Sequence, residues 1–63
     1  MKTYYVKVAE VYTTEIKVEA EDENEAREIA EECLNAGENQ DGSELEDGTY
    51  DYTIDSDEWV VYQ

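Results

Sequence analysis

Carboxylates are the side chains most able to carry chemistry in this chain. Its 63 residues include 19 acidic and 4 basic side chains, one cysteine and no histidine. Two carboxylates can act together as general acid and base, as in glycosidases, but this needs a pocket and a raised pKa on one of them. Because a chain this short encloses little concave surface, we expect no catalytic residues and no enzymatic activity.

Carboxylates also bind divalent cations, and two segments are rich in them. Their acidic residues are Asp41, Glu44, Glu46 and Asp47 in the first segment, and Asp55, Asp57 and Glu58 in the second. A helix–loop–helix calcium site needs oxygen ligands at fixed positions, with Gly and Glu at two of them. Neither segment has this spacing, and there is no histidine and no second cysteine to support another metal. We therefore expect no dedicated metal site and no cofactor.

Cys33 lies on the apolar face of a predicted helix. With no second cysteine in the chain, an internal disulfide is impossible. A buried, unreactive thiol is the expected role.

The charge is distributed unevenly along the chain. Residues 1–20 are balanced, because three lysines face three glutamates there. The remaining acids lie between Glu21 and Glu58, where Arg27 is the one basic residue, and the net charge is −15. A body with such a polyanionic region repels nucleic acid and anionic membrane and attracts basic surfaces. Six tyrosines, a tryptophan and the absence of proline favour a folded domain over a disordered acidic tail.

Side chains alternate between apolar and polar over residues 3–20, which predicts two half-buried antiparallel strands. Tyr4, Val6 and Val8 share one face, and Tyr5 and Ala9 share the other with Lys7. Further on, Ile16, Val18 and Ala20 share the inward face. The turn near Glu10–Thr13 has no Gly or Asn, so its type cannot be read.

The period then changes to that of a helix, predicted over residues 23–36. Asp22 is a good N-cap, Glu25 stands where a capping box places it, and Gly37 is a C-terminal stop. One face of this helix is apolar, comprising Ala26, Ile29, Ala30, Cys33, Leu34 and Ala36. The opposite face carries glutamates and asparagines, so the helix is expected to pack on a sheet.

The rest of the chain predicts an acidic, mobile loop over residues 38–48, a strand over 49–55, a polar turn and a short final strand over 59–62. The result is a single α+β domain of residues 1–63. It has a ββαββ order, an antiparallel sheet of order 2-1-3-4, and the helix on one face. We expect a core of Val6, Val8, Ile16, Val18, Ile29, Cys33, Leu34, Tyr52, Ile54 and Trp59.

A stripe of four helical glutamates is the first candidate contact surface. Glu21, Glu25, Glu28 and Glu32 span roughly 16 Å of helix, or about one charge per 5 Å. One strand of DNA carries a charge about every 3.4 Å of axis, which is within a factor of two. Like charges at this spacing cost stability. A chain that accepts several such pairs either gains solubility or binds something basic, and the sequence leaves both open.

Aromatic side chains among acids form a second candidate surface near the C-terminus. Cation–π contacts and ion pairs make such clusters suitable for an arginine-rich partner, although inward-facing members are expected in the core. The candidate partner-binding residues are therefore Glu21, Glu25, Glu28, Glu32, Asp47, Asp51, Asp55, Asp57, Glu58 and Trp59.

The run YYVKVAEVYTTEIKVEAEDENEAREIAEE at residues 4–32 resembles the small DpnD/PcfM-like proteins of phages and mobile elements of Gram-positive bacteria. The shared features are the two strands and a helix start of the form V-E-A-x-[DS]-x-x-E-A. The resemblance covers about half the chain and lends no site residues. It implies a mobile-element origin, a setting in which small acidic proteins include anti-CRISPR and anti-restriction inhibitors.

These observations lead to two functional hypotheses. The first is an inhibitory binding protein, an acidic nucleic-acid mimic that blocks the basic groove of a host defence nuclease or another DNA-binding protein. The second is an accessory or structural domain whose acidity serves solubility only. We expect a location in the cytoplasm of a host bacterium, with no signal peptide and no membrane span. A homodimer through the face of Tyr5, Ala9 and Val11 is a further hypothesis.

Overall fold

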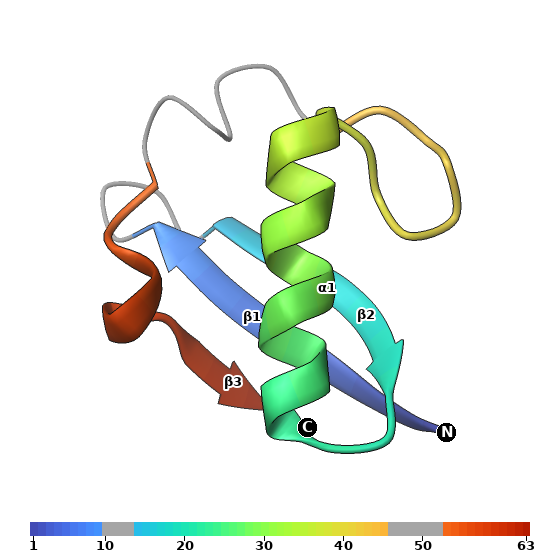
Figure 1. The fold of residues 1–63 in the computed structure, drawn as a ribbon, viewed down its shortest axis with the longest axis vertical. Helices are drawn as coiled ribbons and strands as arrows, with labels where there is room; N and C mark the ends of the chain where they lie inside the picture. The colour runs from blue at the N-terminus through green and yellow to red at the C-terminus, as the bar shows by residue number, and fades with distance from the viewer. Residues whose placement is uncertain (10–13, 46–52) are drawn as a thin grey trace.

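Three strands and one helix make up the described part of the chain. The structure is a computed structural model that describes residues 1–9, 14–45 and 53–63. The elements are β1 (Lys2–Ala9), β2 (Thr14–Ala20), α1 (Glu23–Ala36), a 3₁₀ turn (Ser56–Glu58) and β3 (Val60–Tyr62). They form an antiparallel sheet of order β2-β1-β3 with α1 across one face (Figure 1). This confirms an α+β architecture.

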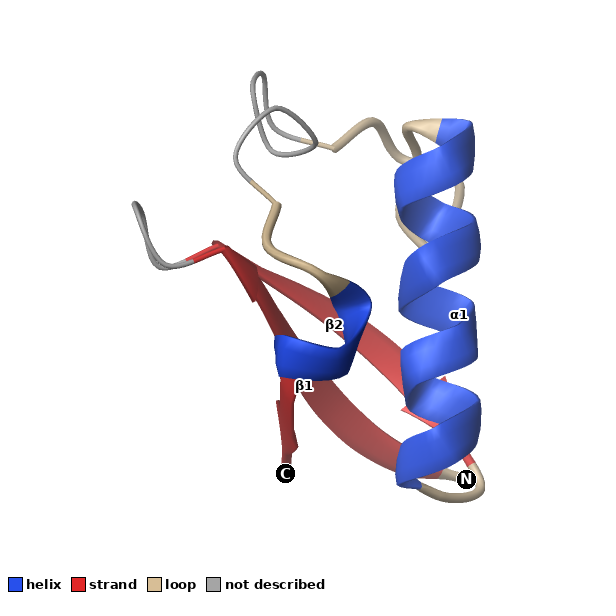
Figure 2. Ribbon diagram, turned by 60° about the vertical axis from the view of Figure 1, so that its left-hand side comes forward, coloured by secondary structure: helices blue, strands red, loops and turns tan. Residues whose placement is uncertain are grey.

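The first two strands are confirmed and pair antiparallel from Lys2 opposite Ala20 to Lys7 opposite Glu15. Val6, Val8, Ile16 and Val18 are buried, because alternation places all four on the face beneath α1. No described helix covers the other face of the sheet, as Figure 2 shows with α1 on one side only.

Ala9 departs from the predicted alternation. The pairing of β1 with β2 shifts between Lys7 and Ala9, so two steps along β1 match one step along β2. Such a bulge turns the following residue towards the opposite face. Val8 and Ala9 are therefore both fully buried, and Ala9 does not lie beside Tyr5 on the open face as the period-two pattern predicted.

The helix is confirmed with the predicted limits. The Oδ1 atom of Asp22 accepts a hydrogen bond from the backbone N–H of Glu25 at 2.8 Å, which is the N-cap interaction. Gly37 ends the helix with φ of 73°, a left-handed conformation that a residue without Cβ adopts at low cost. Ala26, Ala30 and Cys33 are the helical residues buried against the sheet.

The predicted four-strand order is not observed. Residues 49–52 of the predicted third strand lie outside the described residues, and Thr53–Asp55 are not in a strand. The place beside β1 belongs instead to Val60–Tyr62, the segment expected to be the last strand. The backbone N–H of Ile54 donates to the carbonyl of Val8 at 2.9 Å. Ile54 and β3 thus follow one another along a single edge of β1, with the 3₁₀ turn between them.

The core lies between the sheet and α1. Its buried members include Tyr4, the four aliphatic residues of β1 and β2, and Trp59. Of the predicted core, Ile29, Leu34 and Ile54 are partly buried at its margin, and Tyr52 lies outside the described residues. The small Ala26 and Ala30 of α1 are fully buried in this core. No described helix is long and apolar enough to cross a membrane.

Candidate functional site

Three glutamates of the predicted stripe, Glu25, Glu28 and Glu32, lie on one side of α1, and Glu25 also takes part in the hydrogen bonding at its N-terminus. Glu21 precedes the helix, because the N-cap Asp22 has an extended backbone with φ of −152°. Glu21, Glu28 and Glu32 are exposed, and Glu25 is half-buried. The Oε1 atom of Glu25 accepts a hydrogen bond from the backbone N–H of Glu21 at 3.3 Å, which complements the Asp22 cap. A change at Glu25 therefore alters helix stability as well as surface charge, whereas Glu28 and Glu32 make no such bond within the described residues.

The stripe has no basic partner on the helix, because Arg27 makes its hydrogen bond elsewhere. Its Nη2 atom donates to the carbonyl oxygen of Trp59 at 3.2 Å, and its Nε atom is buried without a hydrogen-bond partner among the described residues. At 100° per residue, Glu25, Glu28 and Glu32 each lie at least about 100° around the helix from Arg27, and Glu21 precedes the helix. The one positive charge of the helix thus points towards the β3 side of the fold, and the stripe stays anionic.

The acids of the 3₁₀ turn form a second, separate surface. Asp55, Asp57 and Glu58 are all exposed. Because Arg27 contacts Trp59, this turn lies on the Arg27 side of α1, away from the stripe. The structure therefore brings the predicted contact residues together in two groups and not in one. Asp47 and Asp51 lie outside the described residues.

Trp59 belongs to the core and not to a contact surface. Its side chain is 6% exposed, and its indole N–H donates to the carbonyl of Ile54 at 3.0 Å. This bond satisfies the polar atom of the buried ring, as buried tryptophans require. The indole is therefore not available to a partner, and Trp59 is removed from the candidate contacts.

The exposed aromatic side chains lie on the open face of the sheet. Tyr5 and Tyr62 occupy paired positions on β1 and β3, and their rings stack with centroids 5.8 Å apart. Val60, on the same face, is 53% exposed. Of the residues named for a homodimer, Tyr5 is on this face, Ala9 is buried, and Val11 lies outside the described residues. Dimerisation stays a prediction.

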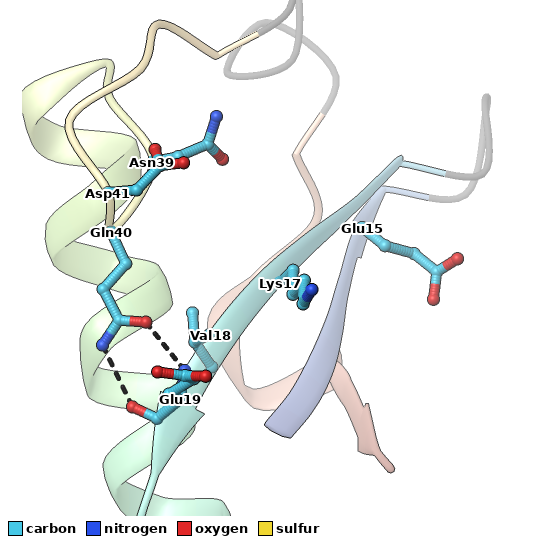
Figure 3. A pocket seen from close by; sticks show the side chains of 7 residues that line it. All are labelled: Glu15, Lys17, Val18, Glu19, Asn39, Gln40 and Asp41. Atoms are coloured by element: carbon cyan, nitrogen blue, oxygen red, sulfur yellow. Dashed lines mark hydrogen bonds between the residues drawn. The ribbon is translucent and has the colours of Figure 1, made fainter. Parts of the chain in front are cut away.

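A groove beside β2 is a feature that the sequence did not indicate. Residues 38–45 form a hydrogen-bonded turn that passes along the outer edge of β2. Between them lies an open groove of about 480 Å³, lined by Glu15, Lys17, Val18, Glu19, Asn39, Gln40 and Asp41. Figure 3 shows Gln40 extending from this turn to Glu19. The two residues are 21 positions apart, so no local pattern relates them.

Two groups near this region have shifted pKa values. Ser43 donates to Oδ1 of Asp41 from its hydroxyl at 2.6 Å and from its backbone N–H at 2.9 Å, and these bonds lower the pKa of Asp41. The pKa of Cys33 is raised, chiefly by burial and further by the negative charges of Glu32 and Asp41. Asp41 is therefore a carboxylate at neutral pH, and Cys33 is a neutral thiol.

Comparisons with known proteins add no further constraint. No family model matches the chain, and no curated protein and no solved structure matches it. Among the described residues, no group of three or more His, Cys, Asp or Glu side chains is arranged to hold a metal ion.

Proposed function

We propose that this protein is an inhibitory binding protein that presents carboxylates in place of nucleic-acid phosphates to a basic groove. The target class is a nucleic-acid-binding protein, such as a defence nuclease. The proposal involves binding and no catalysis. It also includes an origin on a phage or mobile element, which rests on the resemblance of residues 4–32 to the DpnD/PcfM-like proteins.

The observation that supports this proposal best is the unpaired helical stripe. Solvated helix faces usually mix acids and bases, because Glu–Lys pairs four residues apart stabilise the helix. Here Glu28 and Glu32 are exposed on one side of α1, Glu21 is exposed just before the helix, and the one cation of α1, Arg27, is bonded to Trp59 on another side. A rigid helix holds such charges at fixed spacing, which favours fast, electrostatically steered association with a basic surface.

The competing proposal is an accessory domain whose acidity serves solubility. Both proposals predict an acidic surface, but only the mimic requires the charges to be at particular positions. The two can therefore be separated by moving charge between the two acidic surfaces while the total is kept constant.

A matched pair of charge reversals provides this test. The variant E28K/E32K reverses two stripe positions and leaves the Glu25 cap interaction intact. The variant D57K/E58K makes the same change of charge at the 3₁₀ turn. Target proteins captured from a bacterial lysate with the unmodified chain are eluted with rising salt, and their affinity for each variant is measured. We expect E28K/E32K to weaken binding by at least about tenfold and D57K/E58K to weaken it less.

Competition completes the experiment. DNA or RNA should displace the protein from the same target, and the affinity should fall steeply with salt because several charge contacts contribute. If the two reversals change the affinity equally, the position of the charges does not matter, which favours acidity that serves solubility. A complex that survives both high salt and E28K/E32K is held by apolar contacts, for which Tyr62 and Val60 are the exposed candidates, and the mimic proposal is then wrong.

A further inference from the structure

The outer edge of β2 offers hydrogen-bonding groups to a further strand. Within an antiparallel strand, the N–H and C=O of one residue point to the same side, and those of the next residue point to the other. Both backbone groups of Glu19 point away from β1, because the N–H donates to Oε1 of Gln40 at 2.7 Å and the C=O accepts from Nε2 of Gln40 at 3.0 Å. The same groups of Lys17 and Glu15 therefore also point outward into the groove.

Gln40 shows what these outward groups can bind. Its side-chain amide makes one donor and one acceptor contact with a single residue of β2, as a neighbouring strand does (Figure 3). It fills one position of the edge at Glu19 and leaves those at Lys17 and Glu15 without partners among the described residues. An unpaired strand edge next to a preformed groove is the geometry in which extended peptides add to a sheet.

The side chains of the groove define the charge of such a peptide. Glu15, Glu19 and Asp41 contribute three carboxylates, and Lys17 contributes one ammonium group. Glu15, Lys17 and Glu19 all point to the open face of the sheet, because they alternate with buried residues of β2. An added strand complements them if it carries basic residues opposite Glu15 and Glu19 and an acidic or polar residue opposite Lys17, since opposite charges across strands attract.

We propose that the outer edge of β2 binds an extended, basic peptide segment of a partner as an additional strand of the sheet. The peptide pairs with the backbone of Lys17 and Glu15, and Gln40 occupies the next position until a longer segment displaces it. The groove from Glu15 to Glu19 has room for about four residues of extended chain, or roughly 13 Å. This site is separate from the helical stripe and does not depend on the nucleic-acid mimic being correct.

Two other arrangements are less consistent with the fold. The opposite edge of the sheet is formed by β3, which has 3 residues against the 7 of β2 and offers fewer bonds. A second copy of this chain at the β2 edge would bring two molecules of net charge −15 together, which opposes association. A basic peptide is instead attracted by that charge.

The experiment uses an end-capped peptide, Thr-Lys-Val-Glu-Val-Lys-Thr, titrated into the isotope-labelled full chain at low salt and followed by NMR. A control peptide, Thr-Val-Lys-Glu-Lys-Val-Thr, has the same composition with the lysines on the other face of the strand. We expect shifts of the Glu15 and Lys17 amide signals with the first peptide and weaker binding of the second. Shifts confined to α1, or no shift of the Glu15 and Lys17 amide signals, would overturn the proposal.

Variants separate backbone pairing from simple charge attraction. Lys17→Pro removes an outward N–H but no bond to β1, and proline is tolerated at such edge positions. We expect Lys17→Pro to lower the affinity for the peptide by at least about tenfold. Lys17→Gln keeps the N–H and should lower this affinity less. Gln40→Ala frees the position at Glu19 and should strengthen binding about two- to tenfold. Binding unchanged by both Lys17→Pro and Gln40→Ala contradicts the proposal.

A second form of the test leaves the protein unmodified, in case Lys17→Pro does not fold. The same peptide is N-methylated at the backbone amides that face β2, which removes its donors and keeps its charge. Loss of binding supports strand addition. Affinity equal to that of the parent peptide means that the groove attracts cations without pairing, and the proposal is then wrong.

Discussion

Arg27 and Cys33 are two ionisable residues of α1 whose side chains are withdrawn from solvent, Arg27 in part and Cys33 almost completely. Arg27 joins the helix to the C-terminal segment through the carbonyl of Trp59, and this contact also withholds a cation from the helical stripe. Cys33 is 6% exposed and packs between α1 and the sheet. Its raised pKa follows from burial first and from the nearby charges of Glu32 and Asp41 second.

The raised pKa of Cys33 predicts a loss of stability in alkaline solution. A thiol whose pKa is higher in the folded state than in the unfolded chain contributes stability that is fully present below its unfolded pKa. That contribution is lost as the pH rises through the folded pKa. We expect the free energy of unfolding of the unmodified chain, measured by urea denaturation, to fall as the pH rises above the ordinary pKa of a free thiol, about 8.5.

Cys33→Ala isolates this effect, because alanine does not titrate and the tyrosines and lysines are unchanged. The variant starts from a lower stability, since it leaves a small cavity, so the comparison is between the pH-dependent losses. The loss should be smaller in the variant. Equal losses in the two proteins would show that Cys33 does not contribute to the alkaline transition.

At the scale of the element, the N-terminus of α1 is fixed by a few side-chain bonds. Asp22 caps the backbone of Glu25, and Glu25 in turn binds the backbone of Glu21. This arrangement places the helix start, and with it the register of the whole glutamate stripe. The stripe and the cap share Glu25, so the surface charge and the stability of the helix are not independent.

Replacement of the cap should destabilise the protein measurably. Asp22→Ala removes the acceptor for the Glu25 N–H and should lower the free energy of unfolding by about 1 kcal/mol. Glu31→Ala is the matched control, because it removes one exposed carboxylate of the same helix that makes no hydrogen bond within the described residues. Both are measured by urea denaturation at the same salt concentration. If Asp22→Ala costs no more than Glu31→Ala, the cap does not stabilise α1.

At the scale of the whole molecule, the dominant property is its charge. A net charge of −15 is carried by a body with a radius of gyration of 10.4 Å. The repulsion among so many charges at this separation is screened little at low ionic strength, because the Debye length is then about 30 Å. The folded state, which brings the charges closest together, bears most of this cost.

Salt should therefore stabilise the fold. We expect the free energy of unfolding to rise between about 0.01 M and about 1 M sodium chloride, as screening shortens the Debye length to about 3 Å. E28K/E32K raises the net charge by four units, so its stability should depend less on salt. A stability that is independent of salt, or an equal dependence in both proteins, would show that charge repulsion does not limit this fold.

The sequence alone determined the local elements of this protein. The change from a period of two to a helical period, together with Asp22 and Gly37, predicts α1 with the limits that the structure has. The alternation of residues 3–20 likewise predicts β1 and β2 and most of their inward faces. These features depend on residues a few positions apart, so composition and spacing carry the necessary information. The mimic function is not determined in this way and stays a proposal.

The tertiary structure decided what depends on contacts between distant segments. Ile54 and β3 follow one edge of β1 because the other edge is taken by β2, and no local pattern shows that two apolar segments use the same edge. A bulge turns Ala9 inward, and Trp59 fills the core although it is preceded by acids. The contact of Gln40 with Glu19, which reveals the groove, joins residues 21 positions apart. Such pairings are selected by the burial and hydrogen bonding of the complete fold.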